Sequence, residues 1–375
     1  MICYKCMREY TGSVCNHCGF NPSLYENIPT ALLPMTVLHN QYILGIVLGK
    51  GGFGITYTGY DNINMRKVAI KEFFPSSVAY RDSKITTAVS VQPEIGQIYE
   101  NGVNKFYIEA LTLSRLQDIP AIVGIYDFFY ENNTAYIVME FIDGTAVDQI
   151  VLNQGPLDID ITLTIYYPII QALESVHSAG ILHRDISPSN VMLDDKYNAR
   201  LIDLGSSRAY SHEMSTDLTV ILKKGFAPVE QYMRKGRHSP AEDVYAVCAS
   251  MYYTLTGKVP PAATDRMVFD TLMPISSFGV DVPQNIADII LKGMAIRADD
   301  RYSSMFELAE AIDSAVCGSG DHISENRVID EHHDKKRDKK QRRTGINPQI
   351  LLLAVSGTLF IILLIILFFI VFKGR

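Results

Sequence analysis

The residues best suited to chemistry lie in a short stretch near the middle of the chain. Asp185 follows a His-Arg pair, Asn190 stands five positions later, and Asp203 comes thirteen positions after Asn190. A carboxylate can accept the proton of a hydroxyl group, and carboxylate and carboxamide oxygens are ligands that Mg²⁺ prefers. Residues that could serve as a general base and as two ligands for a divalent cation therefore lie within twenty residues of one another.

A glycine-rich segment and a lysine precede this stretch. Residues 49–54 have the pattern GxGxxG, and Lys71 ends the sequence Val-Ala-Ile-Lys. Glycines lack a Cβ, so the tip of a hairpin built from them can lie close to phosphate groups. The pattern alone is weak, because several nucleotide-binding folds use it and a flexible β-turn would also contain such glycines.

The elements around these residues change in type along the chain. Residues 42–48, 55–60, 67–71 and 135–140 are short runs rich in β-branched residues, which predict strands. Residues 161–177 and 243–256 have helical periodicity. The main domain, residues 40–315, is thus predicted to be α+β, with a small strand-rich part followed by a larger helical part.

This main domain resembles the bacterial members of the eukaryotic-type serine/threonine protein kinase family. The resemblance rests on residues 49–54, 68–71, 183–191 and 203–205 in the family's order, and on later segments at 225–230, 243–246 and Arg301. It implies a bilobal protein-kinase fold, with a β-rich N-lobe and a helical C-lobe. The late segments separate protein kinases from small-molecule kinases, and Arg301 is expected to pair with Glu230.

The resemblance also implies the catalytic roles. Asp185 is expected to accept the proton of the substrate hydroxyl, Lys71 to hold the ATP phosphates, and Asn190 and Asp203 to bind Mg²⁺ or Mn²⁺. Lys71 needs a carboxylate partner, for which Glu109 is the choice.

That choice leaves two rivals open. The interval from Lys71 to Glu109 is long for the family, and residues 73–103 look like an insertion. Glu94 and Glu100 are therefore alternative partners.

The ATP site implied by the resemblance includes the glycine-rich loop, the apolar walls at Ala69 and Met192, and a hinge. Met139 aligns with the residue preceding that hinge, where the main chain of Glu140 and Ile142 would contact adenine. The expected ATP-binding residues are Leu48, Gly49, Lys50, Gly51, Gly52, Phe53, Gly54, Ile55, Thr56, Ala69, Lys71, Glu140, Ile142 and Met192.

The chain departs from the family's pattern at several positions. Ser187 stands where serine/threonine kinases usually have a lysine that contacts the γ-phosphate, and its absence could slow transfer. Lys223 and Lys224 are the candidates to replace it. Leu204, Val229 and Thr56 are milder changes.

Because the base, the metal ligands and Lys71 are all present, the sequence predicts an active enzyme; the alternative is a catalytically dead pseudokinase scaffold. Specificity for serine and threonine over tyrosine follows only from the resemblance.

The segment after Asp203 is expected to be an activation loop. In the family, an arginine placed like Arg184 often binds a phosphate on this loop. Residues 206–224 contain several hydroxyl side chains, of which Thr216 and Thr219 are the expected sites of autophosphorylation.

Residues 1–25 form a separate cysteine module. Two CxxC pairs, Cys3 with Cys6 and Cys15 with Cys18, offer the four thiolates that a structural Zn²⁺ requires, as in a zinc ribbon. Gly19 permits the tight turn after the second pair. Disulfide bonding and a redox CxxC are the alternatives. The module is expected either to bind a substrate or partner or to serve as a structural cap, and residues 26–39 link it to the main domain.

The C-terminal end predicts a membrane anchor. Residues 350–372 contain no charged side chain in 23 positions, enough for a helix of about 34 Å across a bilayer core, and we place the span at 348–373. A buried globular helix is the alternative.

The orientation of the span follows from the charges that flank it. The polar juxtamembrane linker at 316–347 contains seven Lys or Arg within residues 335–343, which predicts that the kinase domain lies in the cytoplasm. Anchoring could favour a homodimer, and the net charge of −7 does not favour nucleic acid as a partner.

Overall fold

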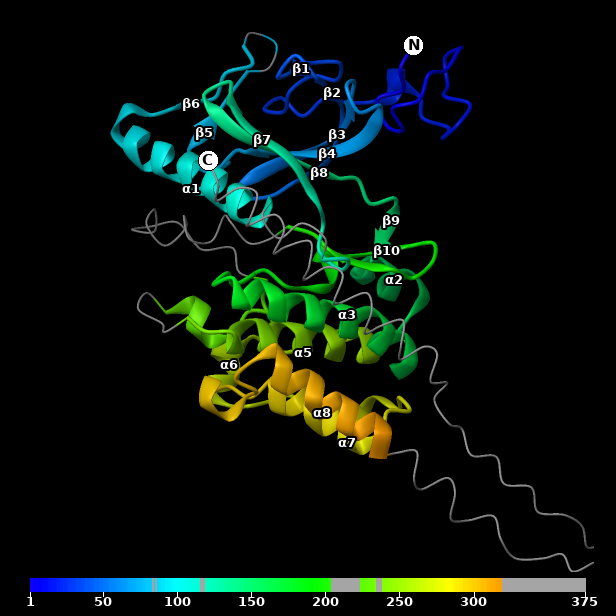
Figure 1. The fold of residues 1–375 in the computed structure, drawn as a ribbon, viewed down its shortest axis with the longest axis vertical. Helices are drawn as coiled ribbons and strands as arrows, with labels where there is room; N and C mark the ends of the chain where they lie inside the picture. Colours follow the sequence, from blue (N-terminus) through cyan, green and yellow to red (C-terminus); the bar gives the residue numbers. More distant parts are fainter. Residues whose placement is uncertain (83, 85, 115–118, 204–222, 234–237, 319–375) are drawn as a thin grey trace, which may run out of the picture. The chain divides into compact units, whose positions relative to one another are not determined.

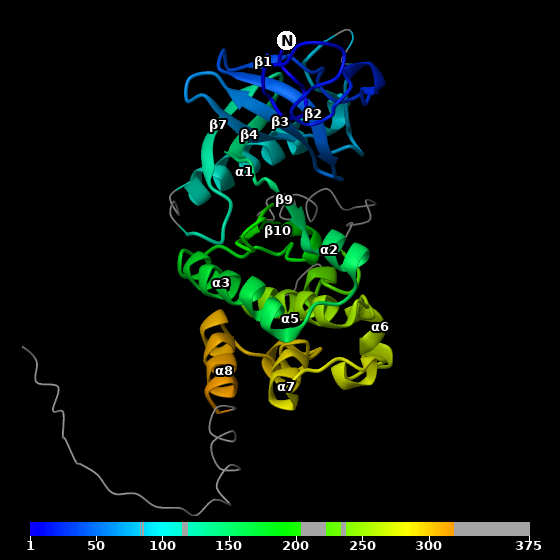
Figure 2. The same ribbon diagram turned by 90° about the vertical axis from the view of Figure 1, so that its right-hand side faces the viewer.

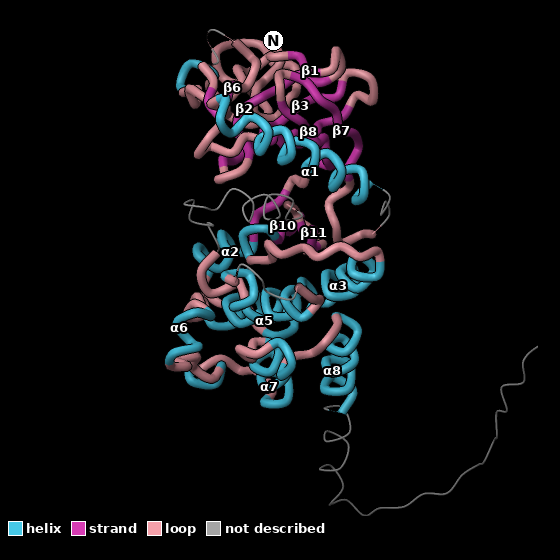
Figure 3. The backbone as a smooth tube through the Cα atoms, turned by 90° about the vertical axis from the view of Figure 1, so that its left-hand side faces the viewer, coloured by secondary structure: helices cyan, strands magenta, loops and turns pink. Residues whose placement is uncertain are grey.

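The computed structural model of the chain describes residues 1–82, 84, 86–114, 119–203, 223–233 and 238–318. These residues belong to one compact unit, Met1–Ile323. They form a strand-rich N-lobe and a helical C-lobe (Figure 1; Figure 3). The predicted bilobal α+β fold is therefore confirmed for this part of the chain.

The N-lobe is built on a six-stranded antiparallel sheet in the order β1-β2-β3-β4-β8-β7. The four predicted strands fall in its central members. The strands are β1 Val37–Leu38, β2 Tyr42–Lys50, β3 Gly54–Asp61, β4 Arg66–Phe73, β7 Ile125–Glu131 and β8 Thr134–Glu140. Helix α1, Gly96–Ser114, packs against β7 and β8 through its apolar face and closes the core of this lobe.

The segment between β4 and α1 is fixed to the sheet by buried polar groups. It contains a short hairpin of β5, Ala79–Tyr80, and β6, Ser90–Val91. The guanidinium of Arg81 donates to both carboxylate oxygens of Glu72 at 2.6 and 2.8 Å, and both side chains are buried. A buried pair of this kind is retained only when its geometry is good, so the inserted segment has a defined position.

The predicted linker at residues 26–39 also belongs to the packed lobe. Ala31 and Leu32 are buried in the core of the N-lobe. The carbonyl of Thr30 accepts two bonds from Arg81, at 2.7 and 3.0 Å. The linker therefore connects the cysteine module to the sheet through an ordered path.

The C-lobe packs its helices around α3 and α5 (Figure 2). Its elements are β9 Gly144–Ala146, α2 Val147–Gln154, α3 Ile159–Ser178, β10 Val191–Asp194, β11 Ala199–Leu201, α5 Ala241–Thr256, α6 Ala263–Val268, α7 Gln284–Gly293 and α8 Met305–Gly318. Asp158 caps α3 by accepting from the N–H of Ile161, and α5 ends at Gly257 in the left-handed region. Residues 161–177 and 243–256, predicted to be helical, lie in α3 and α5.

Two predicted C-terminal segments lie largely or wholly outside the described residues. The predicted span at 348–373 lies wholly outside them. The predicted juxtamembrane linker at 316–347 also lies outside them, except for residues 316–318 at the end of α8. Within the part of the chain that the structure describes, no helix has the length and apolar character needed to cross a bilayer.

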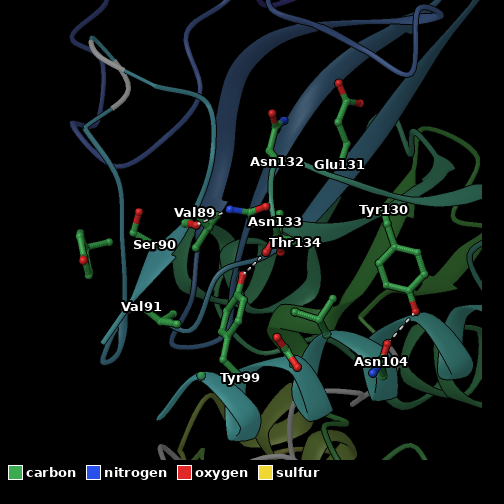
Figure 4. A pocket seen from close by; sticks show the side chains of 14 residues that line it. Val89, Ser90, Val91, Tyr99, Asn104, Tyr130, Glu131, Asn132, Asn133 and Thr134 are labelled. Atoms are coloured by element: carbon green, nitrogen blue, oxygen red, sulfur yellow. Dashed lines mark hydrogen bonds between the residues drawn. The ribbon is translucent and has the colours of Figure 1, made fainter. Parts of the chain in front are cut away.

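A cavity of about 940 Å³ lies on the N-lobe between the inserted hairpin, the start of α1 and the turn between β7 and β8. Figure 4 shows Tyr99 and Tyr130 beside it, with the hydroxyl of Tyr99 donating to the carbonyl of Asn133 at 3.0 Å and that of Tyr130 to Asn104 at 3.1 Å. Glu100, one rival for the partner of Lys71, lines this cavity. The cavity contains none of the residues expected to bind ATP.

Candidate active site

Helix α5 anchors the loop that carries Asp185. The carboxylate of Asp243, which is fully buried, accepts the backbone N–H groups of His183 and Arg184, each at 2.8 Å. His177, at the end of α3, contacts the same carboxylate at 2.8 Å through Nε2. The interpretation of residues 243–246 as the helix that anchors this loop is confirmed. The contribution of His177 was not foreseen, because only the fold brings the end of α3 to α5.

The same loop brings Asp185 and Asn190 together. The 3-10 turn η3, Pro188–Asn190, directs the Asn190 amide back toward Asp185. That amide donates to the Asp185 carbonyl at 2.8 Å and to its Oδ2 at 3.1 Å. The carboxylate is thus oriented by a neighbour, while both side chains remain at the face where the two lobes meet.

Lys71 and Asp203 reach this face from opposite lobes. The Lys71 ammonium lies 2.8 Å from Oδ1 of Asp203. Burial favours the neutral acid, but the Lys71 ammonium outweighs burial and holds the pKa of Asp203 below its ordinary value. Asp203 has a φ of 57°, which is uncommon for a residue other than glycine and is typical of functional sites.

Glu109 lies in the same cavity as Lys71 and Asp203. Burial raises its pKa to about 8, although Lys71 and Arg184 act in the opposite direction. Among the described residues, Lys71 forms its ion pair with Asp203 and not with Glu109. The rivals lie elsewhere: Glu94, in the 3-10 turn before α1, and Glu100, near the start of α1, are both exposed. Glu109 is therefore the best-placed partner, though the two side chains do not pair in this structure.

Several of the predicted ATP-binding residues lie on the paired strands β3 and β4. Lys71 and Ala69 share one face of β4, and their cross-strand partners in β3 are Thr56 and Thr58. Ala69 packs with Val123 and Met139 in a small apolar cluster at the back of the cleft.

The remaining predicted ATP-binding residues lie in or beside β2, β3, β8 and β10. Leu48, Gly49 and Lys50 end β2, Gly54, Ile55 and Thr56 begin β3, and the turn between them holds Gly51, Gly52 and Phe53. Glu140 ends β8, Ile142 follows it, and Met192 lies in β10. The side chain of Ile55 packs in the N-lobe core instead of facing the cleft, so it can contribute only main-chain groups to the loop.

A lysine near the end of the predicted activation loop, Lys223, lies beside Ser187. The Lys223 ammonium donates to Oγ of Ser187 at 2.7 Å, to Oγ of Ser189 at 2.8 Å and to Oδ1 of Asn190 at 2.9 Å. It also lies 4.0 Å from Oδ2 of Asp185. A cation is therefore present in the catalytic loop, although the loop itself supplies none at position 187.

The end of the activation segment is fixed to the C-lobe. The guanidinium of Arg301 donates to both carboxylate oxygens of Glu230, at 3.1 and 3.2 Å, which confirms the expected pair. The loop before it, with Leu204, Thr216 and Thr219, lies outside the described residues.

The four cysteines of the N-terminal module come together as predicted. Their sulfur atoms all lie within 4.8 Å of one another, with Cys3 and Cys18 at 3.6 Å and Cys6 and Cys15 at 3.7 Å. With a Zn–S bond of about 2.3 Å, tetrahedral coordination places sulfurs about 3.8 Å apart, so the cluster has the right size. Four thiols this close cannot all ionise without a cation between them.

The backbone of the module supports this interpretation. Gly19, with a φ of 69°, closes the second turn by donating its N–H to the carbonyl of Cys15 at 2.8 Å. In the first turn Met7 adopts the same region of φ, at 58°. Burial raises the pKa of Cys15, but N–H groups of His17 and Cys18 outweigh it and lower that pKa to about 6. The site fits a soft divalent metal ion bound by thiolates.

The module is docked on the N-lobe sheet. The carbonyl of Tyr4 accepts the N–H of Ile46 at 2.8 Å and the hydroxyl of Thr58 at 2.9 Å. A Cβ at Gly45 would overlap the Tyr4 carbonyl and the Thr58 hydroxyl. Thr58 lies opposite Ala69 in the β3–β4 register, so the module contacts the face of the sheet that also carries Lys71.

Comparison with known proteins agrees with this geometry. The fold and the site define a protein kinase. The model of the protein kinase domain matches residues 42–305, and the chain belongs to that family. The resemblance predicted from the motifs is thereby confirmed.

The chain is also similar to individual bacterial kinases. It is 25% identical to the serine/threonine-protein kinase PknL of Mycobacterium tuberculosis, over 75% of this chain and 67% of that protein. It is 28% identical to the serine/threonine-protein kinase PrkC of Bacillus subtilis, over 77% of this chain and 42% of PrkC.

Two solved structures share the fold. The apo form of PpkA-294 matches with a TM-score of 0.67 and 30% identity, covering 76% of this chain and 99% of that chain. Rad53 in complex with AMP-PNP matches with a TM-score of 0.55 and 19% identity, over 72% of this chain and 65% of that chain, which bears on the fold alone.

Proposed function

We propose that this protein is an active serine/threonine protein kinase that transfers the γ-phosphoryl group of MgATP to hydroxyl groups of protein substrates. The observation that carries the proposal is the convergence of Lys71, Asp185, Asn190 and Asp203 on one face between the lobes. The names of its bacterial relatives support serine and threonine as acceptors.

Residues of both lobes bind and orient the nucleotide. The glycine-rich turn at 51–53 covers the phosphates, and Ala69 with Met192 encloses adenine between apolar walls. Main-chain groups of Glu140 and Ile142 bind the edge of the base. Lys71 holds the phosphates once it leaves Asp203, and Glu109 is then its nearest carboxylate partner in the same cavity.

Asp185 acts on the acceptor. Its carboxylate, oriented by the Asn190 amide, accepts the hydroxyl proton as the hydroxyl oxygen forms a bond to the γ-phosphorus. The bond from that phosphorus to the bridging oxygen breaks, and ADP leaves with the electron pair. Asn190 and Asp203 would supply oxygen ligands to Mg²⁺ or Mn²⁺, and the bound cation would neutralise charge on the phosphate oxygens.

Autophosphorylation is part of the proposal. Arg184 adjoins Asp185 in the catalytic loop and has a φ of 59°, so its main chain is held in an unusual conformation at the site. A guanidinium there suits a phosphate delivered by the activation loop, at Thr216 or Thr219.

The cysteine module is proposed to bind a structural Zn²⁺. It is too small to bury a core, so metal binding would supply its folding free energy. Its contacts with Ile46 and Thr58 favour a role in bracing the N-lobe sheet, which is the structural-cap alternative.

We place the protein at the cell membrane as a single-pass protein. The apolar run at 350–372 and the basic run at 335–343 support an anchor with the kinase domain in the cytoplasm. Confinement in two dimensions raises the local concentration of copies, which favours a homodimer that phosphorylates in trans.

The test is phosphoamino-acid analysis after transfer of label from MgATP to a mixture of protein substrates. Label on serine and threonine that is lost with Lys71→Met supports the proposal. Nucleotide binding without transfer would favour the pseudokinase scaffold, and label confined to tyrosine would contradict the substrate class.

A further inference from the structure

We propose that Lys223 is a further catalytic residue, whose ammonium contacts the γ-phosphate in place of the lysine that the catalytic loop lacks at Ser187. The inference rests on the proposed function and adds a residue to its mechanism. It also chooses between Lys223 and Lys224, which the sequence left open.

The position of the ammonium carries the inference. Lys223 reaches across 36 positions of sequence to the Ser187 hydroxyl, at 2.7 Å, and lies 4.0 Å from Oδ2 of Asp185. A charge this close to the base is also close to the hydroxyl that the base would bind. The acceptor oxygen and the γ-phosphate must meet there, so the ammonium can reach both.

Three neutral oxygen atoms hold the ammonium in place beside Asp185. Ser187 is 1% exposed, and its hydroxyl and that of Ser189 accept hydrogen bonds as neutral groups. The third acceptor, Oδ1 of Asn190, is the atom expected to bind Mg²⁺. A metal ion and an ammonium repel each other at one oxygen, so MgATP binding would turn the ammonium from Asn190 toward the phosphate.

The charge it supplies is needed in the transition state. As the acceptor oxygen bonds to the γ-phosphorus, the proton passes to Asp185 and ADP departs with the electrons of the broken bond. The γ-phosphoryl oxygens bear the negative charge during this exchange. A fixed cation beside them stabilises that charge more than it stabilises bound substrate, which raises kcat.

Lys224 provides a matched control. It adjoins Lys223 but is exposed, and Gly225 after it has a φ of 90°. Lys224→Met removes the same charge from the same segment. We therefore expect Lys224→Met to transfer at the wild-type rate.

The experiment uses the intact chain in detergent and measures kcat together with the dissociation constants of MgATP and MgADP. For Lys223→Met we expect kcat to fall by about 10²–10³, as for loss of one group that stabilises transition-state charge. MgADP should bind as in the wild type, and the preference for MgATP over MgADP should decrease. Lys223→Arg, which keeps the charge, should retain most of the rate.

A second variant separates a catalytic role from a structural one. Ser187→Lys alone places two ammonium groups side by side and should lower both activity and thermal stability. Combined with Lys223→Met, the same Ser187→Lys change restores one cation to the site, so activity should rise above that of either single variant. Recovery of this kind is not expected if Lys223 only ties the loop to the C-lobe.

The outcomes separate the inference from the proposed function. A wild-type rate in Lys223→Met, or an equal loss of MgATP and MgADP affinity, would overturn the role of Lys223 while leaving the kinase intact. If the wild type transfers no label, the proposed function fails, and the ratio of the two affinities in Lys223→Met still decides whether the ammonium contacts the γ-phosphate.

Discussion

At the scale of single residues, Lys71 has two carboxylates within reach and pairs with one of them. Asp203 holds the ammonium at 2.8 Å, whereas Glu109 shares the cavity and has a pKa raised to about 8 by burial. A neutral Glu109 attracts Lys71 only weakly. Protonation of Glu109 therefore favours the ion pair between Lys71 and Asp203. Ionisation of Glu109 favours an ion pair between Lys71 and Glu109 on α1.

The raised pKa of Glu109 predicts a pH-dependent stability. Its ordinary pKa is 4.5, so between that value and about 8 the folded protein binds a proton that the unfolded chain releases. The free energy of unfolding should therefore fall as pH rises through this window, by a few kcal/mol at most. Urea unfolding at several pH values should reveal this slope in the wild type and a smaller slope in Glu109→Gln. Glu100→Gln, an exposed change on the same helix, is the control, and equal slopes in all three proteins would contradict the assignment.

The residues of the site could be predicted from sequence to different degrees. Asp185, Asn190 and Asp203 lie close in sequence and meet through short turns, so their spacing alone indicated a site. Glu109 was one of three choices, because the insertion after β4 hides its spacing from Lys71. The sequence offered both Lys223 and Lys224 as replacements for the lysine missing at position 187. It could not choose between them, because the direction of each side chain depends on the folded C-lobe.

At the scale of elements, the cysteine module acts on the strand that leads into the glycine-rich turn. Tyr4 accepts the N–H of Ile46, and the Tyr25 hydroxyl accepts the N–H of Val47 at 3.1 Å. These contacts precede Gly49 by only two or three residues. The docking of the module on β2 could not be predicted from the sequence. It depends on the main-chain carbonyl of Tyr4 and on Gly45, whose lack of a side chain leaves room for that carbonyl.

Metal removal should therefore weaken nucleotide binding. We expect a chelator to release about one zinc per chain, to loosen the module and to raise the dissociation constant of MgATP several-fold, because β2 loses its support. Gly45→Ala should act similarly with the metal present, since its Cβ would overlap the Tyr4 carbonyl. Gly96→Ala, where a Cβ meets nothing within 4 Å, serves as the control. Unchanged ATP affinity after complete metal release would exclude the bracing role.

At the scale of the whole molecule, the order of motifs sufficed to predict two lobes with the site between them. The motifs at 49–54 and 68–71 lie in the strand-rich part and those at 183–191 and 203–205 lie in the helical part, so their order along the chain implies which lobe contributes which residue. The ordered linker at 26–39 and the hairpin of the inserted segment were not foreseen. Both depend on buried contacts with Arg81 and Glu72 that have no periodic pattern.

The C-terminal segment should determine where the protein is found. We expect the full chain to sediment with membranes and to resist extraction by high salt, because 23 uncharged residues bury far more apolar surface than electrostatic binding supplies. Deletion of 348–375 should release active kinase into the soluble fraction. Replacing the basic residues at 335–343 while keeping the apolar run is the control for electrostatic attachment. A full chain that is soluble without detergent would contradict the anchor.

The most direct test of the central claim is phosphoryl transfer from labelled MgATP by the intact chain, compared with Asp203→Asn. The account predicts label on serine or threonine with the wild type, and a loss of transfer of several orders of magnitude in the variant, which loses a charged metal ligand but keeps the size of its side chain. Equal transfer by both proteins, or no transfer by a wild type that binds MgATP, would contradict the account.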